Sequence, residues 1–448
     1  ELAGSKTYTV WAPTNEALQG LADSIAKVDS NLVKFVKNHI TTQAYLTTGI
    51  QGSIRLRTLD GKNVSFTPTM VEDAKITSID NYVSNGVLNV IDKPLIPRKN
   101  ISEYIRSLTD IGILQREYIK GQDTSYVDTA LATVDHLDEN GKPVLVAGTG
   151  EVSLNKYFTK VAALDNEDST YTYFVLADNG FNNQVNRVTP YFATTDADTT
   201  KMLATFNVLK DVAVRGKVEE ADLPAALQSV MGVNVPINTA NIVRTYEASN
   251  GIVYVVNDIN FALSEKIPTI TIQGENPIFY LRTDKGGNVS IRYKIDTTTN
   301  LPYNDIRITN TGTKAYYAAY KLGALNTCEY KVIYHIVNDT LTTHTPVPGV
   351  LQESIAFGPT TGITVAASVR TVQMAVTYPY FNVTPYNYNE VEATNPGAKA
   401  GYSIGVQNGH LNVLAYRSLY MYMIGANNTT SGLNDVLLDY IKLIPVLP

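Results

Sequence analysis

The chain has little of several residue types and patterns that define common classes of protein. Its 448 residues include a single cysteine, Cys328, which excludes an internal disulfide framework. Acidic residues outnumber lysine and arginine by 42 to 36, and a net charge of −6 argues against a nucleic-acid partner. No apolar run approaches the roughly 18 to 20 residues that cross a bilayer. These absences favour either a cytosolic protein or a bacterial surface protein without disulfides.

Signatures of catalysis and of firm metal binding are also missing. The sequence has no G-x-S-x-G, H-E-x-x-H, Walker or C-x-x-C motif, and its five histidines are scattered without ligand spacing. The acidic stretch DNEDST, with Asp165 and Asp168, offers oxygen atoms for calcium but lacks the spacing of a twelve-residue calcium loop. We therefore expect a protein that is not an enzyme and has no cofactor, with weak calcium binding near Asp165 and Asp168 as the alternative to a solvated loop.

An internal repeat is the clearest pattern that is present. A Ser-Asn-Gly tripeptide ends at Gly86 and again at Gly251, 165 residues later, and each precedes an apolar run. The same stride places the opening stretch TYTVWAPTNEAL on TYFVLADNGF, with Tyr8 over Tyr173. Two separate matches at one stride indicate a tandem duplication.

Each copy shows the same order of expected elements. An apolar strand ends at a turn, and Thr14 in the first copy is a helix-start signal. Apolar residues between Leu21 and Ile40 then recur at helical spacing. An Asn-Gly turn leads into residues 87–91 and 252–256, whose unbroken apolar character predicts strands buried on both faces. The pattern predicts an α+β unit with a core made mostly of strands.

These motifs resemble the fasciclin domain family. TVWAPTNEAL and NGVLNVID match the family's opening T-V-F-A-P-T-N-x-A-F and closing N-G-x-[IV]-x-x-[IV]-D, about 75 residues apart. The second copy diverges, because Asp178 stands for Pro13 at the same stride, but its segment 100–114 resembles the family's leading helix. By the same stride, the leading helices of the first copy would lie upstream of Glu1. We expect a first fasciclin-like domain at 1–98, lacking those helices, and a second, divergent one at 99–268.

The family resemblance also draws attention to one dipeptide. In fasciclin domains a Tyr-His pair after the helical segment has been tied to adhesion, and here the pair is Asn38-His39. The second copy has no histidine at the comparable place, near Asp211 and Val212. Asn38 and His39 are therefore either a remnant of the adhesion motif or, as we prefer for His39, a packing element.

Residues 269–448 follow a different pattern, typical of an antiparallel β-sandwich. Short alternating runs are separated by clusters of Gly, Asn, Pro and Thr. In EYKVIYHIV, we expect Tyr330, Val332, Tyr334 and Ile336 to share one face. The terminal LLDYIKLIPV resembles the last strand of galactose-binding-like jelly rolls. The predicted fold class is therefore α+β, with two fasciclin-like domains followed by an all-β jelly-roll sandwich.

One loop of this last domain is unusually rich in tyrosine. Residues 377–392, TYPYFNVTPYNYNEVE, are interrupted by prolines and carry four tyrosines. Tyrosine combines a flat apolar face with a polar tip, which suits contact with sugars or with other chains. We expect the loop to bind a ligand, a neighbouring domain or another chain through Tyr378, Tyr380, Tyr386 and Tyr388.

Taken together, the resemblances imply a non-enzymatic cell-surface protein. Two fasciclin-like domains with an appended sandwich and almost no cysteine look like surface lipoproteins of Bacteroidota-type bacteria, anchored to the outer membrane by a lipidated cysteine upstream of this chain. We expect an accessory subunit of a glycan-uptake complex that binds glycan and other surface proteins. The alternative is a structural or adhesive subunit that binds host matrix or other proteins and has no carbohydrate role.

Overall fold

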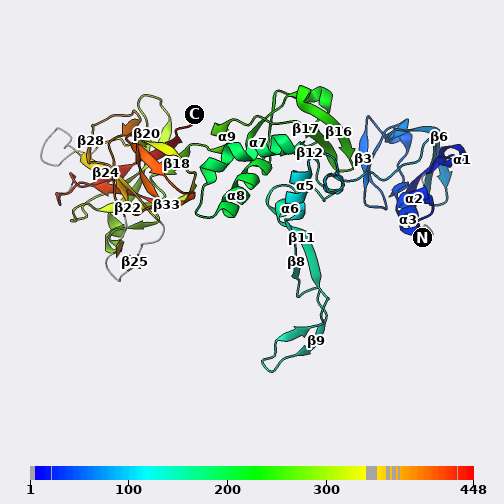
Figure 1. Cartoon of the computed structure of the whole chain (residues 1–448), viewed down its shortest axis with the longest axis horizontal. Helices are drawn as coiled ribbons and strands as arrows, with labels where there is room; N and C mark the ends of the chain where they lie inside the picture. Colours follow the sequence, from blue (N-terminus) through cyan, green and yellow to red (C-terminus); the bar gives the residue numbers. More distant parts are fainter. Residues whose placement is uncertain are drawn as a thin grey trace. The chain divides into compact units, whose positions relative to one another are not determined.

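The computed structural model is an α+β chain that ends in an all-β sandwich (Figure 1). It describes residues 6–21, 23–339, 351–359, 364–365, 370–371, 374–430 and 432–448. The chain forms two units, Glu1–Gln184 with Leu209–Asn260 and Val185–Val208 with Phe261–Pro448. The boundaries expected after residues 98 and 268 stay predictions.

The first domain is built on a seven-stranded sheet. The only tryptophan, Trp11, is fully buried there and meets Phe66 edge to face, 5.3 Å between ring centroids. Thr14 caps the first helix, as predicted, because its Oγ1 accepts a hydrogen bond from the Ala17 amide (3.2 Å). The strands, in spatial order, are β2 (Ile40–Thr42), β1 (Tyr8–Pro13), β7 (Gly86–Ile91), β6 (Ala74–Val83), β5 (Met70–Val71), β4 (Asn63–Phe66) and β3 (Ile54–Arg57), and the helices are α1 (Asn15–Leu18), α2 (Asp23–Ala26) and α3 (Asp29–Asn38).

The second domain repeats the centre of this sheet with four strands. Their spatial order is β13 (Ala213–Arg215), β12 (Tyr171–Leu176), β17 (Gly251–Val256) and β16 (Ile242–Ala248). A two-stranded sheet of β14 (Ala226–Gln228) and β15 (Asn234–Pro236) accompanies it. The helices of this part of the chain are α4 (Ile101–Arg106), α5 (Ile113–Lys120), α6 (Lys156–Lys160), α7 (Asp178–Val188) and α8 (Ala197–Leu209).

Strand pairing confirms the duplication and corrects its register. In both copies the opening strand pairs in parallel with the closing strand, Tyr8 opposite Gly86 and Tyr171 opposite Gly251. The glycines are 165 residues apart, as predicted, but the tyrosines are only 163 apart. The alignment of Tyr8 on Tyr173 is therefore wrong by two residues, and Leu176, not Asp178, takes the place of Pro13. The sequence match at the opening strand was shifted because both strands contain repeated Thr-Tyr and Tyr-Thr pairs.

The two closing strands differ in burial. All residues of β17 and of its partner β12 are buried, as predicted for residues 252–256. In β7 buried residues alternate with half-buried ones, so the prediction for residues 87–91 is wrong. The difference follows from helix α5, whose Gln115 lies against β12: its Nε2 donates to Phe174 O (3.0 Å) and its Oε1 accepts from Leu176 N (2.9 Å).

The C-terminal sandwich is made of antiparallel strand pairs, with a short helix, α9 (Leu263–Lys266), before it. One six-stranded sheet contains β18 (Ile270–Gln273), β35 (Tyr440–Pro445), β23 (Glu329–His335), β32 (His410–Val413), β31 (Ile404–Gln407) and β29 (Val391–Ala393). A seven-stranded sheet contains β19 (Phe279–Tyr280), β22 (Tyr317–Leu325), β33 (Arg417–Gly425), β24 (Leu351–Pro359), β27 (Val376–Thr377), β30 (Gly397–Ala398) and β28 (Phe381–Val383). Smaller sheets contain β20 (Val289–Ile295), β21 (Pro302–Ile308) and β34 (Val436–Leu438), and β25 (Thr364–Val365) with β26 (Arg370–Thr371).

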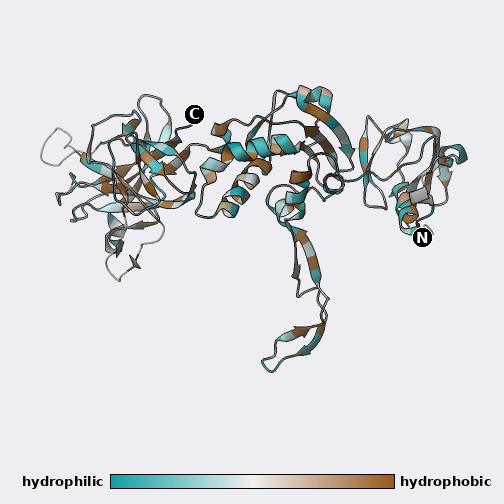
Figure 2. Ribbon diagram, in the orientation of Figure 1, coloured by the Kyte–Doolittle hydropathy of each residue, from teal (hydrophilic) through white to brown (hydrophobic). Residues whose placement is uncertain are grey.

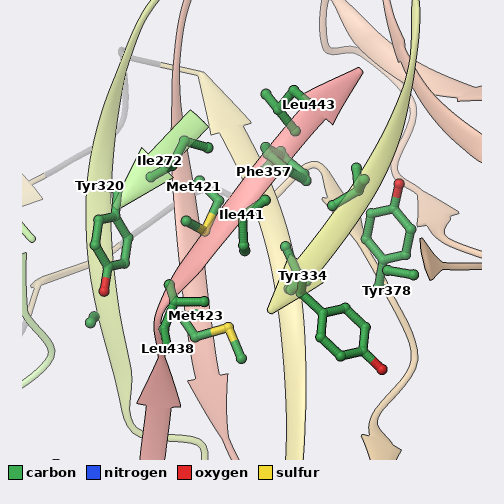
Figure 3. Close-up of a cluster of buried hydrophobic side chains, with 14 of the residues drawn as sticks. Ile272, Tyr320, Tyr334, Phe357, Tyr378, Met421, Met423, Leu438, Ile441 and Leu443 are labelled. Carbon is green, nitrogen blue, oxygen red and sulfur yellow. The ribbon is translucent and has the colours of Figure 1, made fainter. Parts of the chain in front are cut away.

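The core of the sandwich lies between its two large sheets. Figure 3 shows Tyr334 and Ile441 of one sheet with Phe357 and Met421 of the other. Tyr330, Val332 and Tyr334 are all buried here, which confirms that these alternating residues of β23 share one face. The fold class predicted from the sequence is thus the observed one.

One buried acid weakens this core at neutral pH. Glu353 of β24 is fully buried; its Oε1 accepts a hydrogen bond from Leu437 N (2.6 Å), and Oε2 has no partner among the described residues. Burial raises the pKa of this carboxyl well above 4.5. Above pH 4.5 the folded chain therefore keeps a proton that the unfolded chain releases, so stability falls as the pH rises.

The variant Glu353→Gln tests this directly. The amide keeps the acceptor for Leu437 N and has no charge to titrate. We expect its melting temperature to exceed that of the parent by more at pH 8 than at pH 5, with about 2–4 °C for each kcal/mol gained. Asp435→Asn is the matched control, because Asp435 is equally buried but paired with Arg307 (3.0 Å), and this variant should melt lower. An equal melting temperature of Glu353→Gln and parent at both pH values would contradict the assignment.

Candidate binding surfaces

The tyrosine-rich loop of the sandwich exposes only part of its predicted site. Tyr378 is 1% exposed and belongs to the sandwich core, where it meets Phe357 edge to face (6.4 Å). Its expected role in ligand contact is corrected for that reason, since a ring packed in the core cannot meet a ligand at the surface. Tyr378 directly follows β27, and its amide donates to Ile355 O of β24 (2.8 Å), so the residue stays against the sheet. The sequence pattern of the loop did not reveal this contact.

The other three tyrosines lie nearer the surface. Tyr380 is 43% and Tyr386 is 52% exposed, whereas Tyr388 is half-buried. The Tyr380 hydroxyl donates to Gly425 O (3.4 Å), and Tyr386 is held with a left-handed φ of 53° by a hydrogen bond from its amide to Asn338 O (3.0 Å). Tyr380 and Tyr386 are thus the two rings of the predicted set that remain available to a ligand.

His335 fixes the backbone of this loop. Its Nε2 lies 3.0 Å from Tyr388 O and its Nδ1 lies 2.7 Å from Asp439 Oδ2, while its ring stacks on Tyr440 (5.0 Å between centroids). Burial acts to lower the pKa of His335, but the Asp439 carboxylate and the Tyr388 carbonyl outweigh it and raise this pKa above 6.5. The charged imidazole is therefore the form that holds the loop.

A polar network covers the outward face of the same sheet. His410 of β32 contacts Glu329 through Nδ1 and Glu392 Oε1 through Nε2 (2.9 Å). Nearby on β35, Tyr440 donates its hydroxyl to Glu390 Oε1 (2.7 Å), which also contacts the Lys442 ammonium. Sequence reasoning missed these residues, although the alternation of charged with apolar residues in EYKVIYH already marks an outward polar face.

Asn38 and His39 are both buried in the first domain. Asn38 Nδ2 donates to Leu95 O (3.0 Å). His39 Nδ1 lies 2.8 Å from Phe35 O, and its Nε2 accepts from the Leu95 amide (2.9 Å). Burial lowers the pKa of His39 below 6.5, only partly offset by Phe35 O, so this imidazole is neutral in the fold. These hydrogen bonds connect the end of α3 to Leu95. Val212 takes the position of His39 in the second copy, because Trp11 N donates to His39 O and the equivalent Phe174 N donates to Val212 O.

The acidic stretch considered for calcium contacts basic side chains of the first domain. Glu167, 7% exposed, lies 3.0 Å from the Lys62 ammonium and accepts hydrogen bonds from Asn63 Nδ2 (3.1 Å) and Ser249 Oγ (2.8 Å). Asp168, whose side chain is 74% exposed, pairs with Arg57 at 2.5 Å. Among the residues described, no three His, Cys, Asp or Glu side chains are grouped to hold a metal ion.

Arg55 completes this junction between the first and second fasciclin-like domains. Its guanidinium donates to Thr170 Oγ1 (2.6 Å) and to the carbonyls of Glu167 and Ser249 (3.0 Å each). Carbonyl contacts of this kind need a planar, multidentate donor, which arginine supplies. The sequence analysis did not single out Arg55 and Arg57 of β3 or Lys62 before β4, because their partners around Glu167 lie more than a hundred residues away.

Beside α4, a cavity of about 570 Å³ opens among polar side chains. Arg106 donates to both oxygens of Asp123 (2.7 and 2.8 Å), and its guanidinium lies 5.9 Å from the Phe158 ring. Arg106 and Asp123 therefore satisfy each other's hydrogen bonds at the edge of this cavity.

No helix in the described part of the chain is long and apolar enough to span a membrane.

Comparison with known proteins agrees with the first domain's motifs. Residues 1–97 match the family model of the fasciclin domain, which makes this part of the chain a fasciclin domain. Three solved structures are similar to parts of the chain. The FAS1 domain pair of the insect cell adhesion molecule fasciclin I has 15% identity over 58% of this chain and 90% of its own, with a TM-score of 0.24.

The other two structures are carbohydrate-binding modules. They are the C-terminal CBM6 of LamC, a marine laminarinase from Zobellia galactanivorans (8% identity, 39% of this chain, 98% of its own, TM-score 0.22), and the family 11 carbohydrate-binding module of Lic26A-Cel5E from Clostridium thermocellum (15%, 41%, 97%, 0.22). All three TM-scores lie below 0.5, and the sandwich is defined by the two large sheets of this chain.

The junction yields a prediction on stability. Glu167→Ala leaves the largely buried Lys62 ammonium without one of its two carboxylates, so we expect the first domain to lose about 3–5 kcal/mol of stability. Urea unfolding followed by the fluorescence of Trp11, the single tryptophan, reports on that domain. Asp168→Ala is the control, because its exposed pair with Arg57 should contribute about 0–1 kcal/mol. Equal losses in the two variants would rule out Glu167 as the centre of the junction.

The loop anchor yields a prediction on the titration of His335. Because the pKa of His335 is raised in the fold, its stabilising contribution is fully present below pH 6.5 and is lost as the pH rises through the folded pKa. An NMR titration should place this pKa above 6.5, and Asp439→Asn should lower it. Amide exchange around Tyr388 should quicken over the same pH range in the parent. A titration at or below 6.5 in the parent would show that Asp439 does not hold the imidazolium.

Proposed function

We propose that the protein is a non-enzymatic binding protein of a cell surface. Support comes from its histidines, the groups that most often move protons in catalysis near neutral pH. His39, His335 and His410 each have both ring nitrogens engaged by carboxylates or by the backbone. Histidines held by two hydrogen bonds stabilise the shape of a surface. The match of residues 1–97 to the fasciclin domain agrees with an adhesive or binding role.

We further propose that the sandwich binds glycan and serves a glycan-uptake complex of an outer membrane, with a lipid anchor upstream of this chain. The observation that carries the glycan role is the pair of exposed rings, Tyr380 and Tyr386, on a loop fixed by His335. A sugar ring can pack on an exposed tyrosine face, and a fixed backbone reduces the entropy lost on binding.

A glycan array on the purified chain tests this proposal. We expect weak binding to at least one glycan class, reduced about tenfold by Tyr386→Ala or Tyr380→Ala, which corresponds to about 1.4 kcal/mol. Tyr82→Ala is the matched control, since Tyr82 is 77% exposed on β6, in the other unit of the chain, and this variant should bind as the parent does. No response on the array, or equal loss in the control, contradicts the glycan role. Hydrolysis that one carboxylate substitution abolishes would contradict the absence of catalysis.

A second function, binding of another protein, is favoured by a separate observation. Residues 123–155 carry several large apolar side chains that are exposed to solvent. Aliphatic side chains are poor partners for sugars but common at contacts between proteins.

A further inference from the structure

A paired segment of the second domain projects from its unit, and we call residues 123–155 the arm (Figure 1). Its inner ribbon pairs β8 (Asp123–Val127) with β11 (Glu151–Asn155), and its outer ribbon pairs β9 (Val134–Leu137) with β10 (Pro143–Leu145). In the part of the chain that the structure describes, neither ribbon has a third strand. Each strand of the arm therefore has one edge free to pair with another chain.

The arm has a defined structure at its elbow and its tip. At the elbow, Asp128 N donates to Gly150 O (2.8 Å), and a Cβ on Gly150 would lie 2.6 Å from Asp128 O and from Ala132 Cβ, so only glycine fits. At the tip, Asp138 Oδ1 accepts from the amides of Asn140 and Lys142 (2.8 Å each). The two ribbons thus present their side chains in a fixed pattern.

The arm carries more large apolar side chains than a ribbon surrounded by water requires. A two-stranded ribbon in water has no core and is marginally stable by itself. Apolar stretches can be followed along the arm in Figure 2. Its large apolar side chains that are 36% to 67% exposed are Tyr126, Val127, Leu131, Val134, Leu137, Val144 and Val146.

The charge of the arm restricts what can cover these side chains. Between residues 125 and 153 the chain carries one lysine, Lys142, and five carboxylates: Asp128, Asp135, Asp138, Glu139 and Glu151. An anionic lipid surface or another acidic surface would repel it. The complementary surface is apolar in its centre and bordered by lysine and arginine.

We propose that the arm docks on another protein subunit, at an apolar surface with an open sheet edge and a basic border. Strand β9 or β10 adds its free edge to the partner's sheet, the aliphatic side chains enter the apolar centre, and Asp135 and Glu139 face the basic border. The arm and the sandwich loop are separate surfaces in separate units, so this docking does not depend on the glycan role.

Site-specific photo-crosslinking tests the docking in the cells that make the protein. A benzophenone side chain replaces Leu137, 62% exposed on the arm, or Tyr82, 77% exposed on β6, as the control position. We expect irradiation to give one protein adduct from position 137 and none of it from position 82. Mass spectrometry of the adduct should identify a contact peptide that is apolar and has a net positive charge.

Charge reversal separates docking from chance contact. Asp135→Lys combined with Glu139→Lys should reduce the adduct about tenfold, whereas Glu16→Lys with Asp222→Lys, two exposed acids away from the arm, should leave it unchanged. Unaltered Trp11 fluorescence and an unaltered glycan-array response show that each variant is folded and that the sandwich is intact. The absence of an adduct, an adduct to lipid or polysaccharide, an acidic contact peptide, or an adduct that survives charge reversal would each overturn the proposal.

Discussion

The fasciclin-like part of the chain depends on one close contact, the approach of an opening strand to the glycine that begins a closing strand. A Cβ on Gly86 would lie 2.0 Å from Tyr8 O, and one on Gly251 would lie 1.9 Å from Tyr171 O. Both glycines have a φ that disfavours other residues, 157° and 149°. The contact joins, in parallel, two strands that are far apart in the chain, and everything between them must fold as a closed loop of helices and hairpins. This is why the Asn-Gly turns are the most informative residues of the sequence.

The same turn of the second copy also organises its surroundings. Asn250, fully buried, accepts a hydrogen bond from Ile101 N through Oδ1 (2.9 Å) and donates to Leu164 O (2.9 Å), so the turn holds the start of α4 and the acidic loop together. Arg55 of the first domain then binds the Ser249 carbonyl of that turn. A constraint that closes one domain thereby also builds the surface on which the other domain rests.

What could be predicted from the sequence follows from how local each constraint is. The strand–turn–helix at Thr14 and the inward face of β23 are set by neighbouring residues, and both were predicted correctly. The alignment of the two opening strands was wrong by two residues. Their Thr and Tyr residues permit two alignments, and only the pairing of Tyr171 with Gly251 selects one. The burial of Tyr378 was missed because the strand just before it, β27, has only two residues and leaves no periodic pattern.

The candidate surfaces were less predictable than the fold, because their partners are distant in the chain. His335 holds Tyr388 across 53 residues, and Arg55 reaches Ser249 across 194. Such pairs leave no spacing that a single sequence can reveal. The arm is a different case, since its signal was present: valines and leucines mixed with five carboxylates, without the long periodic pattern of a core element.

The polar surfaces and the apolar arm differ in whether their groups have partners within the chain. The carboxylates of the junction and the imidazoles and carboxylates of the sandwich face are paired with other polar side chains, so they stiffen the scaffold. The large apolar side chains of the arm, in contrast, are exposed to water and are not part of a core. An ordered ribbon that leaves aliphatic side chains in water gains hydrophobic free energy when a partner covers those side chains. Association with another protein is the process that such a surface drives most strongly.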